Sequence, residues 1–339
     1  MLSARMNAVR IHAFGGPEVL RYEVAPRPEP APGELLVRVH AIGLNPPDWY
    51  LREGMKDLPP EWRPHPHFPI ILGTDISGIV EALGEGVSGF AVGDEVYSMV
   101  RFPEMGMEGA GAYAEFVSVP ASQAAIKPAN LGHLHAAAAP MSLLTAWQFL
   151  IAVGHDEPNP VAPRPHVPVP LDGKTVLVNG AGGGVGHFAV QLAKWKGARV
   201  IAVASGKNET LMRELGADEF IDYAKIAADE VARDVDLVVD AVGGPTSARF
   251  LKTLRPGGAL FPIFPLGFDG WAEAEARGVA VSAVQVRSSG AQLAEVAPLL
   301  HDGTIRVVID SSFPLAEAKA AHERAARGSI QGKIALTVA

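Results

Sequence analysis

The feature that most restricts the fold of this sequence is a glycine-rich turn between a short apolar segment and an amphipathic one. Residues 174–180 (KTVLVNG) have the pattern of a buried strand, and residues 187–197 (HFAVQLAKWKG) have helical periodicity. The turn between them reads AGGGVG at residues 181–186. A strand that passes through glycines directly into a helix is typical of the first βαβ unit of a doubly wound parallel sheet.

Strand and helix patterns continue to alternate after this unit, as a doubly wound sheet requires. A buried helix is expected just before it, at residues 136–150. We expect the later strands at residues 199–205, 219–223, 235–243 and 259–264, and the helices between them at residues 209–216 and 248–258.

The two ends of the chain have a different character. The first third contains short alternating segments separated by glycine and proline turns, which predicts a small β-rich barrel. Residues 333–338 (KIALTV) read as a strand that needs a sheet to join, so we expect the tail to return to this barrel. For 339 residues we therefore predict a β-rich domain at residues 1–134 and 287–339 and a Rossmann domain at residues 135–286.

Composition excludes several classes of function. The net charge of -8 argues against nucleic acid or an anionic membrane as a partner, because either would need a concentrated basic surface. With 0 cysteines, disulfides, thiolate nucleophiles and cysteine-based zinc sites are impossible. We find neither a signal peptide nor an apolar run of about eighteen residues, and so expect a cytoplasmic protein.

The glycine-rich turn predicts a dinucleotide site. A pyrophosphate must approach the backbone closely, which glycines permit, and the helix that follows offers free N–H groups. Strictly the motif is A-x-G-x-x-G, with an alanine where the commonest pattern has glycine. The cofactor-binding residues expected in the turn are Ala181, Gly182, Gly183, Gly184 and Val185.

The end of the second strand favours NADPH over NADH. An NAD site needs a carboxylate about twenty residues after the glycines, to bind the ribose 2′-hydroxyl. Here the strand ends at Ser205 and is followed by Lys207, a hydroxyl and a cation that suit a 2′-phosphate. Tyr223 follows the next strand and is expected near the same edge. Lys207 could instead be a solvated charge at a helix start.

Taken together, these segments resemble the zinc-independent quinone oxidoreductase branch of the medium-chain dehydrogenase/reductase superfamily. The resemblance rests on residues 180–208, LGADEFIDY, LRPGGAL and QGKIALTV, and on ELLVRVHAIGLNPPDW, LGTDISGIV and VGDEVY in the first third. It implies that the barrel is GroES-like, that NADPH lies between the two domains, and that the protein is a homodimer. Only the proline-rich residues 156–170, a surface loop or a PxxP ligand, fall outside it.

The resemblance also assigns site residues. It places Asn45 and Asp48 on the nicotinamide side of the cleft, Thr145 facing the nicotinamide, and the tail residues Gln331, Gly332 and Lys333 against the cofactor. Asp48 could also cap a helix that starts at Trp49. By itself, Lys333 would be interpreted as an exposed charge at a strand end.

We expect no metal in this protein. Zinc-dependent relatives carry a cysteine and a histidine where this sequence has residues 45–48 and Thr74. We interpret His65 and His67, and His133 and His135, as loop histidines because no acidic or histidine partner accompanies either pair. Without a Lewis acid, the chemistry should suit an easy acceptor, namely a quinone or an α,β-unsaturated carbonyl.

Reduction of an enone also needs a proton. Tyr50 has the best-placed hydroxyl, so Tyr50 and Asp48 are our catalytic candidates. Alternatively, Tyr50 is a packing residue and water donates the proton. Loop residues Met99, Phe102, Met105, Met107 and Phe264, the last also a cofactor-binding candidate, could line an apolar substrate pocket or pack in the core or a dimer contact. The resemblance places the subunit contact of the family at residues 261–264, which include Phe261. Alternative functions are an enoyl reductase of polyketide or fatty-acid assembly, and a cofactor-binding structural or regulatory protein with little turnover.

The first prediction concerns Lys207. Lys207→Ala should weaken NADPH binding by on the order of 1.5–3 kcal/mol, because a charge-assisted contact with the 2′-phosphate is lost. NADH binding should hardly change. Fluorescence titration with both cofactors measures this, and an equal loss for the two would show that the lysine has a structural role.

Overall fold

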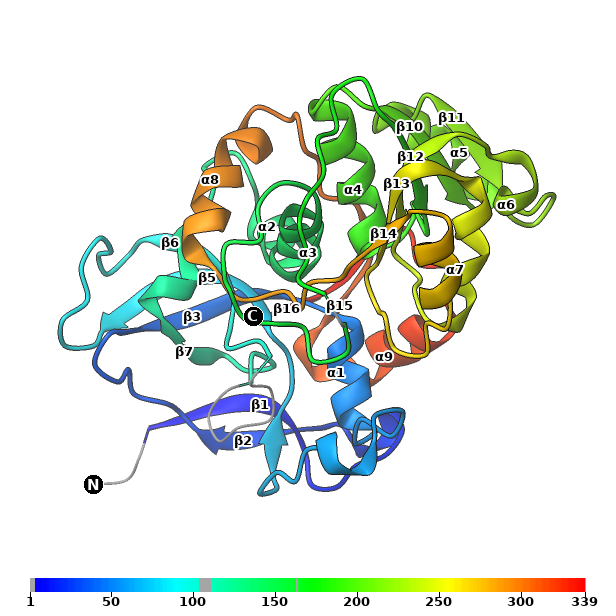
Figure 1. Ribbon diagram of the computed structural model, residues 1–339. Helices are drawn as coiled ribbons and strands as arrows, with labels where there is room; N and C mark the ends of the chain where they lie inside the picture. The colour runs from blue at the N-terminus through cyan, green and yellow to red at the C-terminus, as the bar shows by residue number, and fades with distance from the viewer. Residues whose placement is uncertain (1–3, 104–110, 163, 339) are drawn as a thin grey trace.

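The computed structural model describes residues 4–103, 111–162 and 164–338. Met105 and Met107, two of the expected pocket residues, lie outside this part of the chain. The β-rich part and the parallel sheet with its helices occupy opposite sides of the molecule (Figure 1). No helix in the described ranges is long and apolar enough to cross a membrane.

The glycine-rich turn lies where the sequence predicts it, in a parallel sheet. This sheet has the strand order β11-β10-β9-β12-β13-β14, and its neighbouring strands pair in parallel. β9 is the first of these strands in the chain. The chain then adds β10 and β11 on one side of it and β12, β13 and β14 on the other side, so the strand order reverses at β9. Ligands of such sheets bind where the order reverses, at the carboxyl ends of the strands. The strands are β9 (Thr175–Asn179), β10 (Arg199–Ala204), β11 (Glu219–Asp222), β12 (Val235–Asp240), β13 (Leu254–Pro262) and β14 (Ala280–Val281).

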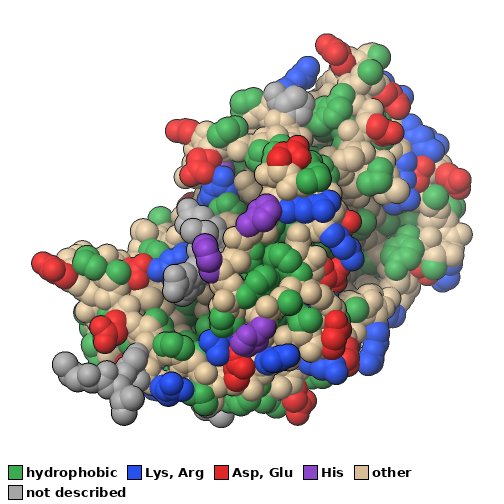
Figure 2. All heavy atoms as spheres, turned by 90° about the horizontal axis from the view of Figure 1, so that it is seen from below, with side chains coloured by type: hydrophobic (Ala, Val, Ile, Leu, Met, Phe, Trp, Pro, Cys, Tyr) green, Lys and Arg blue, Asp and Glu red, His purple; other side chains and the backbone are tan. Residues whose placement is uncertain are grey.

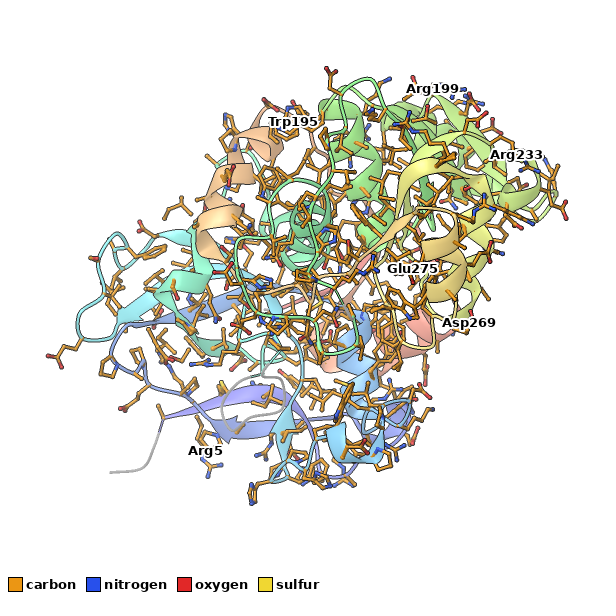
Figure 3. The ribbon with its side chains drawn as sticks, viewed as in Figure 1. Arg5, Trp195, Arg199, Arg233, Asp269 and Glu275 are labelled. Carbon is orange, nitrogen blue, oxygen red and sulfur yellow. The ribbon has the colours of Figure 1, made fainter. Side chains whose placement is uncertain are left out.

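Helices cover both faces of this sheet and bury its apolar side chains. One core joins Val176 and Val178 of β9 to α3 and α4, and a second joins Leu177 to Phe250 and Leu260 on the other face. Charged residues such as Arg199 and Glu275 point outward around this region (Figure 3). These helices are α3 (Pro140–Leu150), α4 (Gly184–Trp195), α5 (Glu209–Glu214), α6 (Ala228–Val231) and α7 (Trp271–Ala276), whereas α2 (His133–Ala138) packs on the β-rich part.

Two expectations about these elements are wrong in detail. The single helix expected at residues 136–150 is two helices, α2 and α3, because Pro140 starts a new helix and cannot continue the previous one. The helix expected at residues 248–258 is the 3-10 helix η5 (Pro245–Thr253), and Leu254 already belongs to β13. Gly257 lies inside β13 and has φ 76, an angle that a helix running to residue 258 could not contain.

The first third of the chain forms the predicted β-rich part. Its sheets have the strand orders β2-β1-β4 and β15-β16-β3-β5-β6-β8, and β7 pairs with β3. The strands are β1 (Arg5–Ile11), β2 (Arg21–Pro26), β3 (Glu34–Gly43), β4 (Ile70–Ile71), β5 (Asp75–Leu83), β6 (Glu95–Met99), β7 (Phe116–Pro120) and β8 (Ala124–Ile126). Helix α1 (Pro46–Arg52) follows β3, and the 3-10 helices are η1 (Pro17–Val19), η2 (Pro60–Trp62) and η3 (Ala121–Gln123).

The tail returns to this sheet, as predicted. Strand β16 pairs with β3 in antiparallel register, with Ala335 opposite Gly43. In Figure 1 the tail elements lie beside the amino-terminal strands and α1. The remaining elements are η4 (Gly206–Asn208), α8 (Gly290–His301), β15 (Ile309–Pro314), η6 (Leu315–Glu317), α9 (Ala318–Ala326) and β16 (Lys333–Thr337). The domain boundaries at residues 134 and 287 stay predictions.

The proline-rich segment has no regular secondary structure in its described residues, but it is anchored to the protein. Its His166 is buried and contacts the Ser282 hydroxyl at 2.9 Å and the Phe149 carbonyl at 2.8 Å. The imidazole ring also packs edge-on against Phe261, at 4.5 Å between centroids. The segment therefore covers the β13 region of the sheet as well as facing solvent.

Gly332, just before β16, gives a test of this architecture. It has φ +77, and a Cβ there would lie 2.3 Å from the Val308 carbonyl oxygen. Gly303 has φ +80 with nothing near a Cβ, so it is a matched control. Both alanine variants should lose about 1–2 kcal/mol of unfolding free energy through the left-handed backbone. Gly332→Ala should lose a further ~1–3 kcal/mol through the clash, measured by urea unfolding. Equal losses would contradict the close contact.

Candidate functional site

The glycine-rich turn has room for a phosphate at one point and is tightly packed at the others. A Cβ on Gly183 would meet only the Gly180 carbonyl oxygen, at 3.4 Å, whereas a Cβ on Gly186 would lie 2.1 Å from the same oxygen. Gly183, Gly184 and Val185 are partly exposed, and Ala181 and Gly182 are buried. The first N–H groups of α4 have no acceptor within the helix. The turn therefore fits a pyrophosphate at residues 183–185, the arrangement that the motif predicts.

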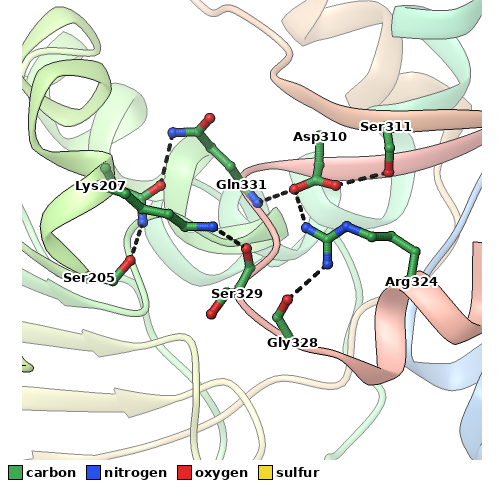
Figure 4. Close-up of polar contacts among 9 residues, drawn as sticks. Ser205, Lys207, Asp310, Ser311, Arg324, Gly328, Ser329 and Gln331 are labelled. Atoms are coloured by element: carbon green, nitrogen blue, oxygen red, sulfur yellow. Dashed lines mark hydrogen bonds and ion pairs between the residues drawn. The ribbon is translucent and has the colours of Figure 1, made fainter.

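A loop of the tail lies against this turn. Gly332 N–H donates to the Gly182 carbonyl at 2.8 Å. The Gln331 amide donates to the Asn208 side chain at 3.0 Å, and Asn208 donates in turn to the Ser205 hydroxyl at 3.0 Å (Figure 4). Lys207 is exposed, and its ammonium donates to the Ser329 carbonyl at 2.5 Å. The structure thus brings Ser205, Lys207 and Gln331 together at the carboxyl end of β10.

Tyr223 lies at the same edge of the sheet. Its backbone N–H donates to the Ala204 carbonyl at 3.2 Å, and its ring is 56% exposed. An exposed aromatic ring beside Ser205 and Lys207 is available to a ribose or a base. Its role in cofactor binding stays a prediction, as do those of the residues in the turn.

Lys333 is buried, not exposed as its position at a strand end suggests. Its ammonium donates to the Leu44 carbonyl at 2.8 Å, to the Ser142 hydroxyl at 3.1 Å and to the Asn45 side-chain oxygen. Burial lowers the pKa of Lys333, an effect opposed by the charges of Asp75 and Asp48. Pairing of β16 with β3 draws the lysine inward, where these oxygens replace water.

Asn45 and Asp48 are both 0% exposed. The Asn45 amide donates to Asp75 at 2.9 Å, and the Asn45 N–H donates to Asp48 Oδ2 at 2.9 Å. Asn45 is therefore the N-cap of α1, which begins at Pro46 and not at Trp49, and Asp48 is the third residue of the helix, whose carboxyl completes a capping box. Burial raises the pKa of Asp48 to about 7 and that of Asp75 to about 6. A catalytic role for Asp48 stays a prediction.

A chain of hydrogen bonds reaches Asp48 from helix α9. Arg52 contacts His322 Nδ1 at 2.7 Å, and Tyr113 lies 3.0 Å from His322 Nε2 and 3.1 Å from Asp48 Oδ2. Burial lowers the pKa of His322 to about 3, so the imidazole is neutral. Because arginine can only donate, His322 Nδ1 accepts, Nε2–H donates to the tyrosine oxygen, and the tyrosine hydroxyl donates to Asp48.

Sequence reasoning missed Asp75, Tyr113, Ser142 and His322 as members of this network. A signal exists for His322: it falls on the same helical face as Ala318, Ala321 and Ala325, where a polar residue must find a buried partner. Thr145 lies one turn after Met141 on α3, is buried, and donates to the Met141 carbonyl at 2.7 Å. Its contact with the nicotinamide stays a prediction.

Tyr50 lies on a different face of α1 from Asp48 and lines a pocket. The tyrosine is 41% exposed, and its ring centroid is 6.5 Å from that of Phe264, which follows β13. The pocket has a volume of about 200 Å³ and is lined by Tyr50, Glu53, Met55, Lys56, Asp57, Leu58 and Phe264. Met99, also expected in the substrate pocket, is 0% exposed, so it packs in the core.

The histidine pairs differ from the expectation in two respects. His65 and His67 lie in a loop, but His133 and His135 belong to α2, so the loop assignment of the second pair is wrong. His133 also has the acidic and histidine partners that were not expected: it contacts Glu95 at 3.1 Å and stacks on His40, and it contacts the Ser77 hydroxyl at 2.8 Å. Within the described ranges, no group of three or more histidine, aspartate or glutamate residues could hold a metal ion.

Comparison with known proteins shows similarity along nearly the whole chain. Residues 31–129 match the alcohol dehydrogenase GroES-like domain family, and residues 215–336 match a zinc-binding dehydrogenase family. The mitochondrial NAD(P)H oxidoreductase RTN4IP1 of Mus musculus is 33% identical over 373 residues, covering 99% of this chain and 90% of that protein.

Two solved structures are similar throughout. The quinone oxidoreductase of Coxiella burnetii has a TM-score of 0.84 and 30% identity, covering 99% of this chain and 100% of that one. A mycobacterial protein solved in complex with NADPH has a TM-score of 0.79 and 29% identity, covering 98% of this chain and 99% of that one.

The buried carboxyls predict a dependence of stability on pH. The pKa of Asp48 rises from 3.8 in the unfolded chain to about 7 in the folded protein, so its contribution to stability is complete below pH 4 and is lost as the pH rises through 7. The difference in unfolding free energy between wild type and Asp48→Asn should favour wild type most at pH 4, and this difference should decrease until pH 8. Thermal unfolding of both proteins across this range measures the difference.

Asp75→Asn is a matched comparison for this prediction. The pKa of Asp75 is raised to about 6, so the same trend should be complete about one unit lower in pH. A difference between wild type and either variant that does not change between pH 4 and pH 8 would contradict the raised pKa.

Proposed function

The chain belongs to the quinone oxidoreductase branch of the medium-chain dehydrogenase/reductase superfamily, and from that premise we propose that it uses NADPH to reduce a quinone or an α,β-unsaturated carbonyl without zinc. It is an NAD(P)H oxidoreductase with a Rossmann domain and a GroES-like domain. The observation that carries the proposal is the pocket between α1 and the segment after β13, at the carboxyl edge of the parallel sheet.

The residues of the chain fit the cofactor. Residues 183–185 and the α4 N–H groups would hold the pyrophosphate, and Ser205, Lys207 and Tyr223 would hold the adenosine end. No acidic residue directly follows β10 in the sequence, which supports NADPH. The Asp222 carboxyl of β11 does lie beside Gly206, where a Cβ would be 2.6 Å from its Oδ2. When bound, the cofactor supplies a hydride to the acceptor. The chain must then bind the acceptor, orient it and deliver a proton.

The pocket favours a flat, neutral acceptor. Tyr50 and Phe264 give it two aromatic rings inclined at 37°, and Met55 and Leu58 add apolar surface. Of its charged residues, Lys56 is paired with Glu53 at 2.6 Å, and Asp57 adds a negative charge. A pocket of about 200 Å³ with this lining suits a small, flat acceptor such as a simple quinone or enone.

Zinc independence rests on the residues at the expected metal position. Asn45 accepts a hydrogen bond from the buried ammonium of Lys333, so a positive charge already touches it. A second cation beside this ammonium would be repelled. Although one matching family is described as zinc-binding, we propose that chelators leave the activity of this chain unchanged.

Tyr50 is the side chain that could supply the proton. Burial, together with the charges of Asp57 and Glu53, raises the pKa of Tyr50, so its hydroxyl stays protonated and is a weaker acid than a free tyrosine. Its place in the pocket lining supports the role, because a carbanion or enolate left by hydride addition is basic enough to take a proton from a phenol. Asp48 is fully buried on the other side of α1 and would act by holding the helix.

We also propose a cytoplasmic homodimer whose partners include neither nucleic acid nor membrane. On the face in Figure 2, the described acidic and basic side chains are mixed, and neither sign forms a continuous surface. Phe261, which the family resemblance associates with subunit contact, is 1% exposed and packs on His166, whereas Phe264 is 42% exposed. A dimer contact in this region would therefore involve Phe264.

A substrate panel tests the proposed function. We expect NADPH oxidation to be fastest with simple quinones and enones, slower with enoyl thioesters and slowest with aldehydes. Fastest turnover of enoyl thioesters would favour a role in polyketide or fatty-acid assembly. Tight NADPH binding with negligible turnover throughout the panel would favour a structural or regulatory protein.

Tyr50→Phe tests the proton donor. The variant keeps the ring against Phe264 and removes the hydroxyl, so enone turnover should fall by about 10²–10⁴-fold while NADPH affinity is unchanged. Quinone reduction is the control, because a reduced quinone takes protons readily from water. Steady-state rates on both substrates measure the effect. If the variant reduces enones as fast as wild type, water is the donor.

A further inference from the structure

The loop at residues 328–332 connects the tail of the GroES-like domain to the proposed cofactor site. On one side it contacts the Rossmann domain at three points: Ser329 through Lys207, Gln331 through Asn208, and Gly332 through Gly182. Figure 4 shows the lysine ammonium directed toward the Ser329 carbonyl. The backbone of this loop, and not a side chain of the Rossmann domain, thus accepts the hydrogen bond from the Lys207 ammonium.

The other side of the loop is held by a charge pair on the tail itself. Arg324 of α9 donates to Asp310 Oδ1 of β15 at 2.7 Å and to the Gly328 carbonyl at 2.9 Å. The same Asp310 oxygen accepts the Gln331 N–H at 2.9 Å (Figure 4). One guanidinium and one carboxylate therefore bind both ends of the loop, where Ser329 lies between them.

The loop needs these contacts to keep its shape. Gly328 and Ser329 have φ angles of 66 and 49, in the left-handed region that a serine adopts only at a cost. Without Asp310 and Arg324, the chain would relax toward ordinary backbone angles and turn the Ser329 carbonyl away. Both charged side chains are largely buried, at 9% and 23% exposure, so their pairing is only partly weakened by solvent.

An ordered Lys207 matters for the recognition of a phosphate. A free lysine side chain samples many rotamers, and fixing it on binding costs conformational entropy. The ammonium has three N–H groups, so it can keep its bond to Ser329 and still donate to a phosphate. A lysine that is already held beside Ser205 would bind a 2′-phosphate more tightly than a mobile one.

We propose that Arg324 and Asp310 are positioning residues for cofactor selectivity, because they hold the loop whose Ser329 carbonyl fixes Lys207 for the 2′-phosphate of NADPH. This inference rests on the proposed function, which assigns NADPH to the site. It adds that selectivity depends on a charge pair in the tail, which acts through the loop and through Lys207.

The test is a binding cycle with Arg324→Gln, Lys207→Ala and the double variant, by fluorescence titration of NADPH and NADH. Arg324→Gln should weaken NADPH binding about tenfold, within the range for one charge-assisted hydrogen bond, and NADH binding less than twofold. In the Lys207→Ala background, Arg324→Gln should have no further effect on NADPH. Arg324→Lys keeps the positive charge but lacks the planar guanidinium, so its NADPH affinity should lie between those of wild type and Arg324→Gln.

Arg327→Gln is the control for net charge, since Arg327 is exposed and lies on the same segment. It should leave both affinities unchanged. The proposal is overturned if Arg324→Gln weakens NADH equally, if its effect persists without Lys207, or if Arg327→Gln has the same effect. Should Arg324→Gln unfold, as thermal melting would reveal, Asp310→Asn takes its place in the same cycle. A wild type that does not prefer NADPH overturns the cofactor assignment itself, and this is known before any variant is compared.

Discussion

The ammonium of Lys333 is the interaction on which the rest of the site depends. It lies between three segments that are distant in sequence, since it donates to Leu44 and Asn45 after β3 and to Ser142 on α3. Its aliphatic chain also passes close to the glycine-rich turn, because a Cβ on Gly184 would lie 3.2 Å from Lys333 Cδ. One buried charge thus joins the two domains beside the expected pyrophosphate site.

Burying an ammonium is costly unless oxygens replace its water, and this requirement organises the surrounding residues. Asn45 accepts from Lys333 and donates to Asp75, while Asp75 accepts the Met141 N–H at the start of α3. Asp48 receives hydrogen bonds from Asn45 and Tyr113. These contacts fix α1, and through α1 they fix the position of Tyr50 in the pocket.

Much of the fold could be predicted from the sequence because its signals are local. The strand–glycine–helix unit, the parallel sheet and the return of the tail strand are confirmed. The prediction of a helix at residues 248–258 is wrong because the apolar spacing of this segment also suits a 3-10 helix followed by a strand. The anchoring of His166 could not be foreseen, since its partners Ser282 and Phe149 lie far from it in the sequence.

The sequence by itself determined the chemistry available to this protein. It provides a glycine-rich turn that suits a pyrophosphate and a lysine, not an acid, directly after β10. With 0 cysteines, it excludes thiolate chemistry and cysteine-based metal sites. Only the tertiary structure decided which of these groups are buried and which can meet a ligand. Lys333 and Asp48 are enclosed and Tyr50 faces a pocket because strands and helices from opposite ends of the chain pack around them. Burial is a property of those long-range contacts, and no local pattern encodes it.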